Sequence, residues 1–162
     1  MLTSIDHIVL TANDMDKTVS FYCDILGMTI EDFTPSGGGE TRKSLKFGNQ
    51  KINLHHADAP YKPHAKNPVS GAVDICFLSS TPIEKWQEIF TKNKVEIEDG
   101  PVQKTGATGP IMSIYVRDPD QNLIEISNQI WFDVPVNVSV RNTKTVNVLV
   151  GTVLTNQSYQ PA

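Results

Sequence analysis

Four polar side chains occupy matching places in two similar stretches of this chain. The first stretch carries His7 near its start and Asn53 near its end, and the second carries Asp74 and Glu125 at the corresponding places. If the two stretches fold alike, the repeat brings these four side chains to one central place. Imidazole and carboxylate groups are common ligands of divalent transition metals. The pattern therefore predicts a metal site.

The first stretch predicts a strand, a helix and three further strands. Residues 5–11 alternate with the period of a strand and place His7 on one of its faces. Asn13 and Asp14 supply a helix start, and Gly27 is a suitable residue just after the helix. The further strands are predicted at residues 28–33, 43–47 and 50–56.

The second stretch repeats this order. A strand is predicted at residues 73–79, and Thr81, Pro82 and Glu84 predict a helix that begins with a capping box. Residues 100–110 predict a glycine-rich loop, whose second half either covers a substrate or is a plain connection. The remaining strands are predicted at residues 95–98, 112–116 and 123–127.

Composition and charge narrow the classes of protein and partner. The chain has 162 residues, a formal net charge of −4 and no basic stripe, which argues against nucleic acid as the main partner. It has no apolar run near the roughly 20 residues of a membrane helix, and its predicted first strand leaves no room for a signal peptide. We therefore expect a cytoplasmic protein with no membrane partner, in which Cys23 and Cys76 are buried free thiols.

The two stretches predict one domain over residues 1–129. Its modules are residues 4–57 and residues 72–129, and residues 58–71 form a proline-containing linker between them. Residues 130–162 lie outside the repeat. Valines alternate with polar residues in this extension, which predicts a β-hairpin or a disordered segment.

Three motifs resemble the vicinal oxygen chelate superfamily, which includes glyoxalase I, fosfomycin-resistance proteins, extradiol dioxygenases and bleomycin-binding proteins. They are Asp6-His7, the helix end at residues 21–28, and Asp118-Pro119-Asp120 before Glu125. Within the superfamily, the chain most resembles the group of glyoxalase domain-containing protein 5-like proteins. This second resemblance is carried by residues 47–55, 74–77 and 100–111.

The resemblance implies a fold, a cofactor and an assembly. The expected fold is α+β, with two βαβββ modules that form a cup-shaped mixed sheet, and the expected assembly is a homodimer. The expected cofactor is one divalent transition metal per site, namely Mn, Fe, Co, Ni or Zn. His7 and Glu125 stand at positions that hold the metal in the superfamily.

Two positions depart from the pattern of glyoxalase I. Asn53 stands where that enzyme has a glutamate that takes the substrate's proton, and an amide cannot act as such a base. Asp74 stands where a histidine is usual, so this carboxylate either binds the ion or acts as the general base. We assign Asp74 as the base and do not expect ordinary glyoxalase I activity.

His55 is the candidate for the vacant ligand position. It lies two residues beyond Asn53, on the same strand face and about 6.6–6.8 Å further along. His7, His55 and Glu125 would then supply two imidazoles and one carboxylate, a composition that suits these metals. In the alternative interpretation, His55 is a hydrogen-bonding group in the wall of a pocket.

Together these features predict a divalent-metal-dependent enzyme that acts on a small oxygenated substrate. The metal would polarise an oxygen of the substrate in a lyase, isomerase or transferase type of reaction. One alternative is an extradiol-type dioxygenase, which uses the same kind of ligand set. Another alternative is a dimer that binds a small ligand without catalysis, in the manner of the bleomycin-binding proteins.

Overall fold

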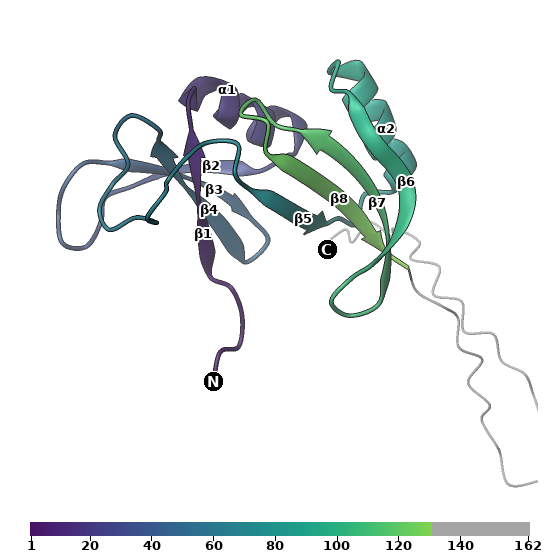
Figure 1. Ribbon diagram of the computed structural model, residues 1–162, viewed down its shortest axis with the longest axis horizontal. Helices are drawn as coiled ribbons and strands as arrows, with labels where there is room; N and C mark the ends of the chain where they lie inside the picture. Colours follow the sequence, from purple (N-terminus) through teal and green to yellow (C-terminus); the bar gives the residue numbers. More distant parts are fainter. Residues whose placement is uncertain (131–162) are drawn as a thin grey trace, which may run out of the picture. The chain divides into compact units, whose positions relative to one another are not determined.

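The computed structural model describes residues 1–130, which contain two modules of the same construction (Figure 1). The helices are α1 (Met15–Ser20), which continues into a π-helical segment at Phe21–Ile25, and α2 (Ile83–Lys92). The strands of the first module are β1 (His7–Ala12), β2 (Thr29–Phe33), β3 (Arg42–Phe47) and β4 (Gln50–His56). Those of the second are β5 (Asp74–Leu78), β6 (Ile97–Thr105), β7 (Pro110–Arg117) and β8 (Leu123–Gln129). The hairpin predicted in the C-terminal extension lies outside the described residues.

Each module forms a four-stranded mixed sheet with the same topology. The strand orders are β1-β4-β3-β2 and β5-β8-β7-β6. The first and last strands of each module pair in parallel, and the remaining pairs are antiparallel. The prediction of an α+β fold built from two βαβββ modules is confirmed. None of the helices in residues 1–130 has the length and apolar character that a membrane span requires.

The start of the first helix follows the prediction. Asp14 is the N-cap residue, and its side chain accepts a hydrogen bond from the backbone N–H of Lys17 at 3.1 Å. After the helical segments the chain reverses at Gly27, which has a φ of 76°. A residue with a Cβ atom is strained in this left-handed conformation, so glycine suits the position.

The predicted capping box of α2 is wrong. Pro82, rather than Thr81, is the N-cap residue, and no side chain caps this end of the helix. The reason is the extended ψ of 147° at Pro82, which leaves its carbonyl to accept the first helical hydrogen bonds, from Lys85 and Trp86. The backbone N–H of Thr81 donates instead to the Ser79 hydroxyl, at 3.0 Å.

Most of the predicted glycine-rich loop is strand. β6 extends to Thr105, and its pairing with β7 shifts register on both sides of Asp99. Gly100 lies in this irregular part, where a Cβ atom would come 2.4 Å from the Ser113 carbonyl oxygen. Here glycine therefore marks a bulge and a close backbone approach rather than a loop. The true turn is short and is closed by a hydrogen bond from the Gly106 N–H to the Gly109 carbonyl.

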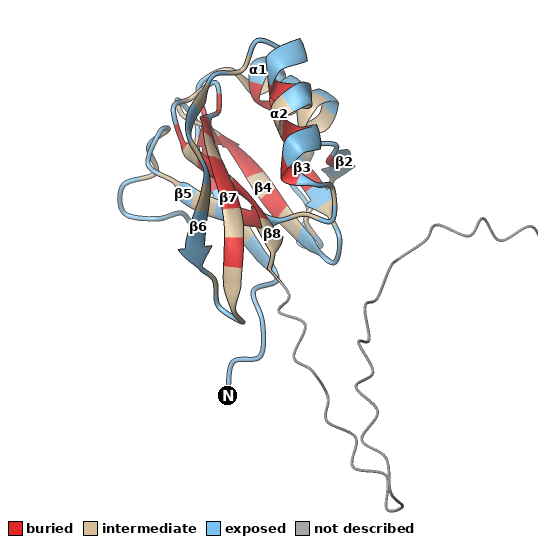
Figure 2. Cartoon of the chain, turned by 90° about the vertical axis from the view of Figure 1, so that its right-hand side faces the viewer, coloured by how far each residue is buried: buried red, intermediate tan, exposed pale blue. Residues whose placement is uncertain are grey.

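One apolar core contains side chains from both modules. Figure 2 shows the buried positions on β4, β7 and the helices. Phe47 of β3 and Phe77 of β5 meet edge to face, with ring centroids 5.2 Å apart. Both rings lie on the sheet face that contributes to the core, which we call the covered face of each sheet. The modules therefore contact each other through their covered faces. On the opposite face of each sheet, which we call its open face, no helix of residues 1–130 is packed (Figure 2).

A buried turn in the second module also joins the two modules. The Asp118 carboxylate accepts hydrogen bonds from the backbone N–H groups of Asp120 and Asn122, the Asn122 amide and the Tyr22 hydroxyl, at 2.9, 2.9, 2.8 and 3.0 Å. Asp118 is only 2% exposed. Burial and the neighbouring Asp118 charge raise the pKa of Tyr22, so its hydroxyl stays a donor.

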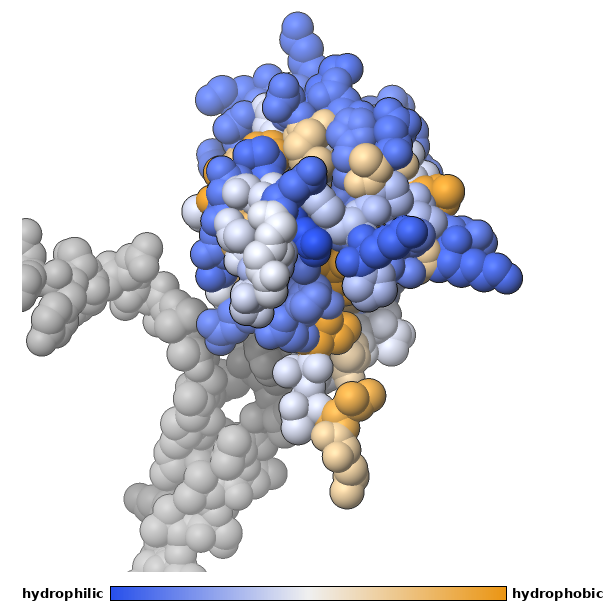
Figure 3. Space-filling model, turned by 90° about the vertical axis from the view of Figure 1, so that its left-hand side faces the viewer, coloured by the Kyte–Doolittle hydropathy of each residue, from blue (hydrophilic) through white to orange (hydrophobic). Residues whose placement is uncertain are grey.

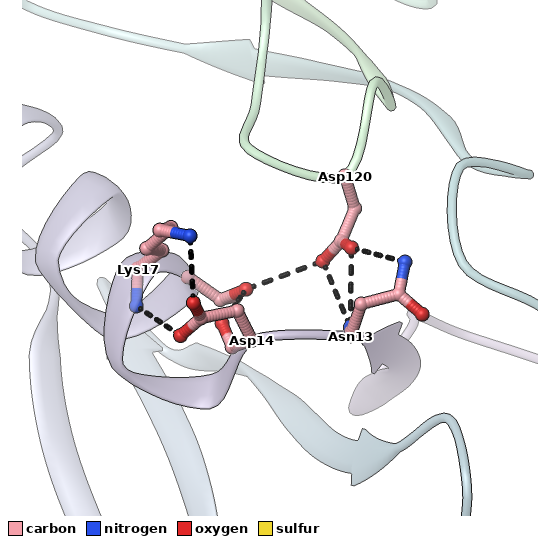
Figure 4. A network of polar contacts seen from close by, with 5 residues as sticks. Asn13, Asp14, Lys17 and Asp120 are labelled. Carbon is pink, nitrogen blue, oxygen red and sulfur yellow. Dashed lines mark hydrogen bonds and ion pairs between the residues drawn. The ribbon is translucent and has the colours of Figure 1, made fainter.

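The next carboxylate of this turn reaches the start of α1. Asp120 accepts from the backbone N–H of Asn13 at 3.1 Å and from its side-chain amide at 2.8 Å, as Figure 4 shows. The Thr18 hydroxyl, which donates to the Asp14 carbonyl at 2.9 Å, also lies 3.3 Å from the Asp120 carboxylate. The Asp118-Pro119-Asp120 motif therefore has a structural role, because its two carboxylates tie the second module to the helix of the first.

Candidate metal and ligand sites on the open sheet faces

The first open face carries both candidate histidines. Because side chains alternate along a strand, His7, Val9 and Thr11 of β1 share one face. The parallel register places Asn53 of β4 beside Val9 and His55 beside Thr11. The structure therefore confirms that Asn53 and His55 lie on the same side of this sheet as His7.

His7 is exposed, and a neighbouring carboxylate holds its ring. Its Nδ1 atom lies 2.6 Å from an Asp6 carboxylate oxygen. This hydrogen bond is the largest cause of the lowered pKa of Asp6. Because Nδ1 is engaged, Nε2 is the ring nitrogen left for another partner. Histidines that bind metals are usually held by a carboxylate in this way.

The deeper end of the first open face has unmet hydrogen-bonding capacity. The Oδ1 atom of Asn53, the Nδ1 atom of His55 and the Nε atom of Arg42 are buried, and residues 1–130 supply no hydrogen-bond partner for them. His55 is 6% exposed, and its pKa is lowered first by burial and then by the charges of Arg42 and His64. Buried polar atoms normally have partners, so these three carry a desolvation cost that no hydrogen bond within residues 1–130 offsets.

The second open face presents a carboxylate in a polar setting. The register of β8 places Glu125 beside Cys76 of β5 and Tyr115 of β7. Glu125 accepts a hydrogen bond from the Ser127 hydroxyl at 3.2 Å, and the fully buried Ser113 hydroxyl lies 2.8 Å from that of Ser127. Burial, with the nearby Glu125 charge, raises the pKa of Tyr115 to about 12, so its phenol remains protonated at neutral pH.

Cys76 corrects an expectation from the sequence. It is exposed rather than buried, because strand alternation places it on the open face. Its sulfur lies 3.3 Å from the Ser127 hydroxyl, and partial burial raises the pKa of its thiol. Cys23 is partly buried. The sequence indicates where both cysteines lie but not which face of the β5 strand becomes covered.

A pocket of about 560 Å³ opens on the second face. It is lined by Cys76, Tyr115 and Glu125 together with residues 104–108, which are the end of β6 and the turn after it. Lys104 lies over the Tyr115 ring, 5.4 Å from its centroid. The turn is shorter than the predicted loop, but it does border the pocket that contains Glu125.

Asp74, the candidate base, is exposed at the start of β5. Its register partner on β8 is Leu123, two residues before Glu125. Alternation puts Asp74, Cys76 and Glu125 on the same open face. The structure therefore places the candidate base and one candidate metal ligand on the second module.

The three candidate metal ligands are not brought together within one chain. Over residues 1–130, the structure contains no group of three or more His, Cys, Asp and Glu side chains that could hold a metal ion. His7 and His55 lie on the first open face and Glu125 on the second, whereas the modules meet through their covered faces. The predicted ligand set stays a prediction, since a single chain does not test how two open faces meet.

Sequence reasoning missed two side chains of the first site. The Tyr61 ring packs edge to face on His55, with centroids 5.3 Å apart, and the Arg42 guanidinium lies 4.2 Å from the centroid of the Tyr61 ring. Arg42 could have been found, because it shares its strand face with Ser44, the register partner of Asn53. Tyr61 lies in the linker, where no periodic pattern indicates its position.

The fold and the matched sequence define the class of this protein. Residues 4–126 match the model of the Glyoxalase/Bleomycin resistance protein/Dioxygenase superfamily. The chain belongs to that superfamily, which confirms the resemblance drawn from its motifs. Members of this class bind small molecules, and the open sheet faces described above are the surfaces that this fold offers.

Particular relatives show how close the likeness is. The chain is 45% identical over 130 residues to virulence protein STM3117 of Salmonella typhimurium, and the match covers 80% of this chain and 87% of that protein. The crystal structure of STM3117 matches the structure of this chain with a TM-score of 0.73. The chain is also 47% identical over 125 residues to glyoxalase domain-containing protein RDO1 of Mycosarcoma maydis, and this match covers 77% of the present chain and 68% of RDO1. The structure of lactoylglutathione lyase from Agrobacterium tumefaciens is 23% identical in sequence and matches with a TM-score of 0.57, over 79% of this chain and 95% of that chain. At this identity the likeness shows the fold alone.

Proposed function

We propose that this protein is a divalent-metal-dependent enzyme that acts on a small oxygenated substrate, in a lyase, isomerase or transferase type of reaction. One observation carries the proposal. His7 and His55 lie on one open sheet face, and Glu125 lies on the other, next to a pocket. Two imidazoles and one carboxylate suit Mn, Fe, Co, Ni or Zn.

The donor groups fit such an ion. His7 is held by the Asp6 carboxylate, which leaves its Nε2 atom for a ligand bond. Within residues 1–130, the buried Nδ1 atom of His55 has no partner, and Glu125 is oriented by the Ser127 hydroxyl. When bound, the metal would act as a Lewis acid on an oxygen of the substrate.

We propose that a second copy of the chain completes the site. In this homodimer, the first open face of one protomer meets the second open face of its partner. Among the described strands, the edge strands β1 and β5 each pair on one side only, and they expose Val9 and Leu78 on their open faces. Unpaired strand edges with exposed apolar side chains favour association, and a two-fold dimer would form two equivalent sites.

The proposed general base is Asp74. It lies on the same open face as Glu125, and a carboxylate can take a proton from an atom next to the polarised oxygen. Asn53 cannot do so, because its amide has no basic lone pair at neutral pH. The reaction is therefore not that of ordinary glyoxalase I. Asp74→Asn should keep the metal and lose turnover.

The first experiment measures metal. Protein purified without chelator should bind one transition metal per chain, and His7→Ala and Glu125→Ala should each abolish this binding. A wild-type protein that binds none of the five metals at micromolar concentration would refute the enzyme proposal and favour a binding protein.

Mixed dimers test whether two copies share each site. His7→Ala and Glu125→Ala chains are expressed together with different affinity tags, and the heterodimer is isolated through both tags. If the sites are shared, one site carries both substitutions and the other is intact, so the heterodimer should bind about one metal per two chains. A heterodimer without metal would place the whole site within one chain.

Two alternatives remain distinguishable. An extradiol-type dioxygenase is favoured by the two-histidine, one-carboxylate composition, and it predicts oxygen uptake with catechols by the Fe(II)-loaded protein. A binding protein without catalysis is favoured by the absence of a complete ligand cluster among residues 1–130. It predicts that ligand affinity is the same with and without metal.

A further inference from the structure

Two buried serine hydroxyls form a hydrogen-bonded chain that ends at the carboxylate of Glu125. Ser113 of β7 and Ser127 of β8 are register partners, and strand alternation puts both on the open face that carries Glu125. Both serines are 0% exposed. Their hydroxyl oxygens lie 2.8 Å apart, and that of Ser127 lies 3.2 Å from Oε1 of Glu125. Buried hydroxyls are costly unless they are hydrogen-bonded, so the direction of these bonds matters.

Proton counting gives the direction of this serine chain. Each serine hydroxyl has a single proton to donate, whereas an ionised carboxylate only accepts. If Ser127 donated to Ser113, the Glu125 oxygen would face a lone pair, and residues 1–130 would give the Ser113 proton no other acceptor. A hydrogen bond to a charged acceptor is also roughly twice as strong as one between neutral groups. The stable arrangement therefore runs from Ser113 to Ser127 to Glu125.

A thiol completes the surroundings of Ser127. The Cys76 sulfur lies 3.3 Å from the Ser127 hydroxyl oxygen, and it comes from β5, the strand on the other side of β8. Because Ser127 gives its proton to Glu125, Cys76 is the donor in this contact, through an S–H group that donates weakly. Ser127 therefore accepts from both neighbouring strands and donates toward the carboxylate.

We propose that Ser113 and Ser127 are positioning residues for the metal ion, which hold Oε1 of Glu125 and leave its Oε2 as the oxygen that binds the ion. This inference rests on the proposed function, in which Glu125 is a metal ligand. Carboxylates that bind metals are themselves hydrogen-bonded, and removing such a partner typically costs about 10–100-fold in metal affinity. Neither serine needs to touch the ion or the substrate in this role.

The serine chain would act by holding the Glu125 side chain before the ion arrives. A glutamate side chain has several rotatable bonds and loses much conformational freedom when it is fixed in one place. A ligand group that is already held loses less of this freedom on binding. Hydrogen bonds in a chain also strengthen one another. Ser113 should therefore affect Glu125, although its hydroxyl is bonded to that of Ser127.

The first module supplies a matched control. Ser44 of β3 is also 0% exposed, and as the register partner of Asn53 it lies on the first open face. Its hydroxyl donates to the backbone carbonyl of Glu31 at 3.4 Å rather than to a carboxylate. Ser44→Ala thus removes the same group at the same burial without breaking the chain to Glu125.

The control also leaves the molecular surface unchanged. Figure 3 shows the side of the first module, where most of the described surface is hydrophilic and the apolar areas are small. Because Ser44 contributes no exposed surface, Ser44→Ala creates no new apolar area there.

The test measures metal affinity and the state of the carboxylate separately. The affinity of the full-length protein is measured by competition with a fluorescent chelator, using whichever of Mn, Fe, Co, Ni and Zn the wild type binds most tightly. The proteins are the wild type, Ser127→Ala, Ser113→Ala, the double variant and Ser44→Ala. In metal-free protein, NMR follows the carboxyl carbon signal of Glu125, and amide spectra show that each variant is folded.

Ser127→Ala should weaken metal binding by about 10–100-fold, and Ser113→Ala by about three- to tenfold. Adding Ser113→Ala to Ser127→Ala should cause little further loss, because the effect of Ser113 passes through Ser127. Both single substitutions should move the Glu125 carboxyl signal of the metal-free protein. Ser44→Ala should change neither the affinity nor this signal.

The outcomes separate this inference from the proposed function. A wild-type protein that binds none of the five metals would overturn both. Metal binding that is equally tight with and without the serine hydroxyls, or a Glu125 carboxyl signal that neither substitution moves, would overturn the inference alone. Additive losses in the double variant would also overturn it, since each serine would then act by itself.

Discussion

The buried turn and the first open face both bury polar side chains, but they differ in how these are paired. In the turn, each carboxylate oxygen of Asp118 accepts hydrogen bonds from neighbouring residues. On the open face, the Asn53 oxygen and the His55 Nδ1 atom have no hydrogen-bond partner in the described part of the chain. The difference separates two roles, because paired polar groups stabilise the fold and unpaired ones remain available for a ligand.

The largest effect on stability is expected at Asp118. Asp118→Ala removes the acceptor of four hydrogen bonds and leaves buried donors unpaired, so the free energy of unfolding should fall by about 4 kcal/mol. Tyr22→Phe removes only one of these bonds and should cost about 1 kcal/mol. Urea unfolding measures both. A loss at Asp118 no greater than that at Tyr22 would show that the turn is not the stabilising element described here.

The next effect concerns ligand binding rather than stability. His55→Ala should weaken metal affinity by about a hundredfold, which is about 2.7 kcal/mol, because an imidazole is a stronger ligand than a neutral amide for these metals. Asn53→Ala should weaken it much less. Calorimetric titration with Zn or Mn compares the two variants. The opposite ranking would assign the ligand position to Asn53.

A smaller loss is expected where the turn meets the first helix. Asp120→Ala removes the acceptor for the backbone N–H and the side-chain amide of Asn13 and should lower the free energy of unfolding by about 2 kcal/mol. Asp16→Ala changes an exposed carboxylate of the same helix and should cost less than about 0.5 kcal/mol. Equal losses in thermal unfolding would contradict a joining role for Asp120.

The smallest effect tests the open face directly. Asn53→Leu replaces a buried unpaired oxygen with an apolar group of similar size, so stability should rise by about 1 kcal/mol rather than fall. The same substitution in the turn, Asn122→Leu, should be destabilising, because the Asn122 amide is paired with Asp118. If Asn53→Leu destabilised the protein as strongly, the Asn53 amide would belong to the stabilising network.

The sequence predicted the repeat and the order of the elements because strand and helix periods depend on neighbouring residues alone. Alternation along β1 and β4 also placed His7, Asn53 and His55 on one face. It could not show which faces meet, since the contact of Phe47 with Phe77 joins residues far apart in the chain. For the same reason it missed Tyr61 over His55 and the exposure of Cys76.

The shared core has a consequence for the two halves of the repeat. Each half has its own sheet, yet side chains of both halves belong to one apolar cluster in which Phe47 meets Phe77, so neither half alone covers its apolar side chains. Cutting the chain within the linker should therefore leave the two fragments associated. The halves expressed separately should aggregate, but they should refold together when mixed.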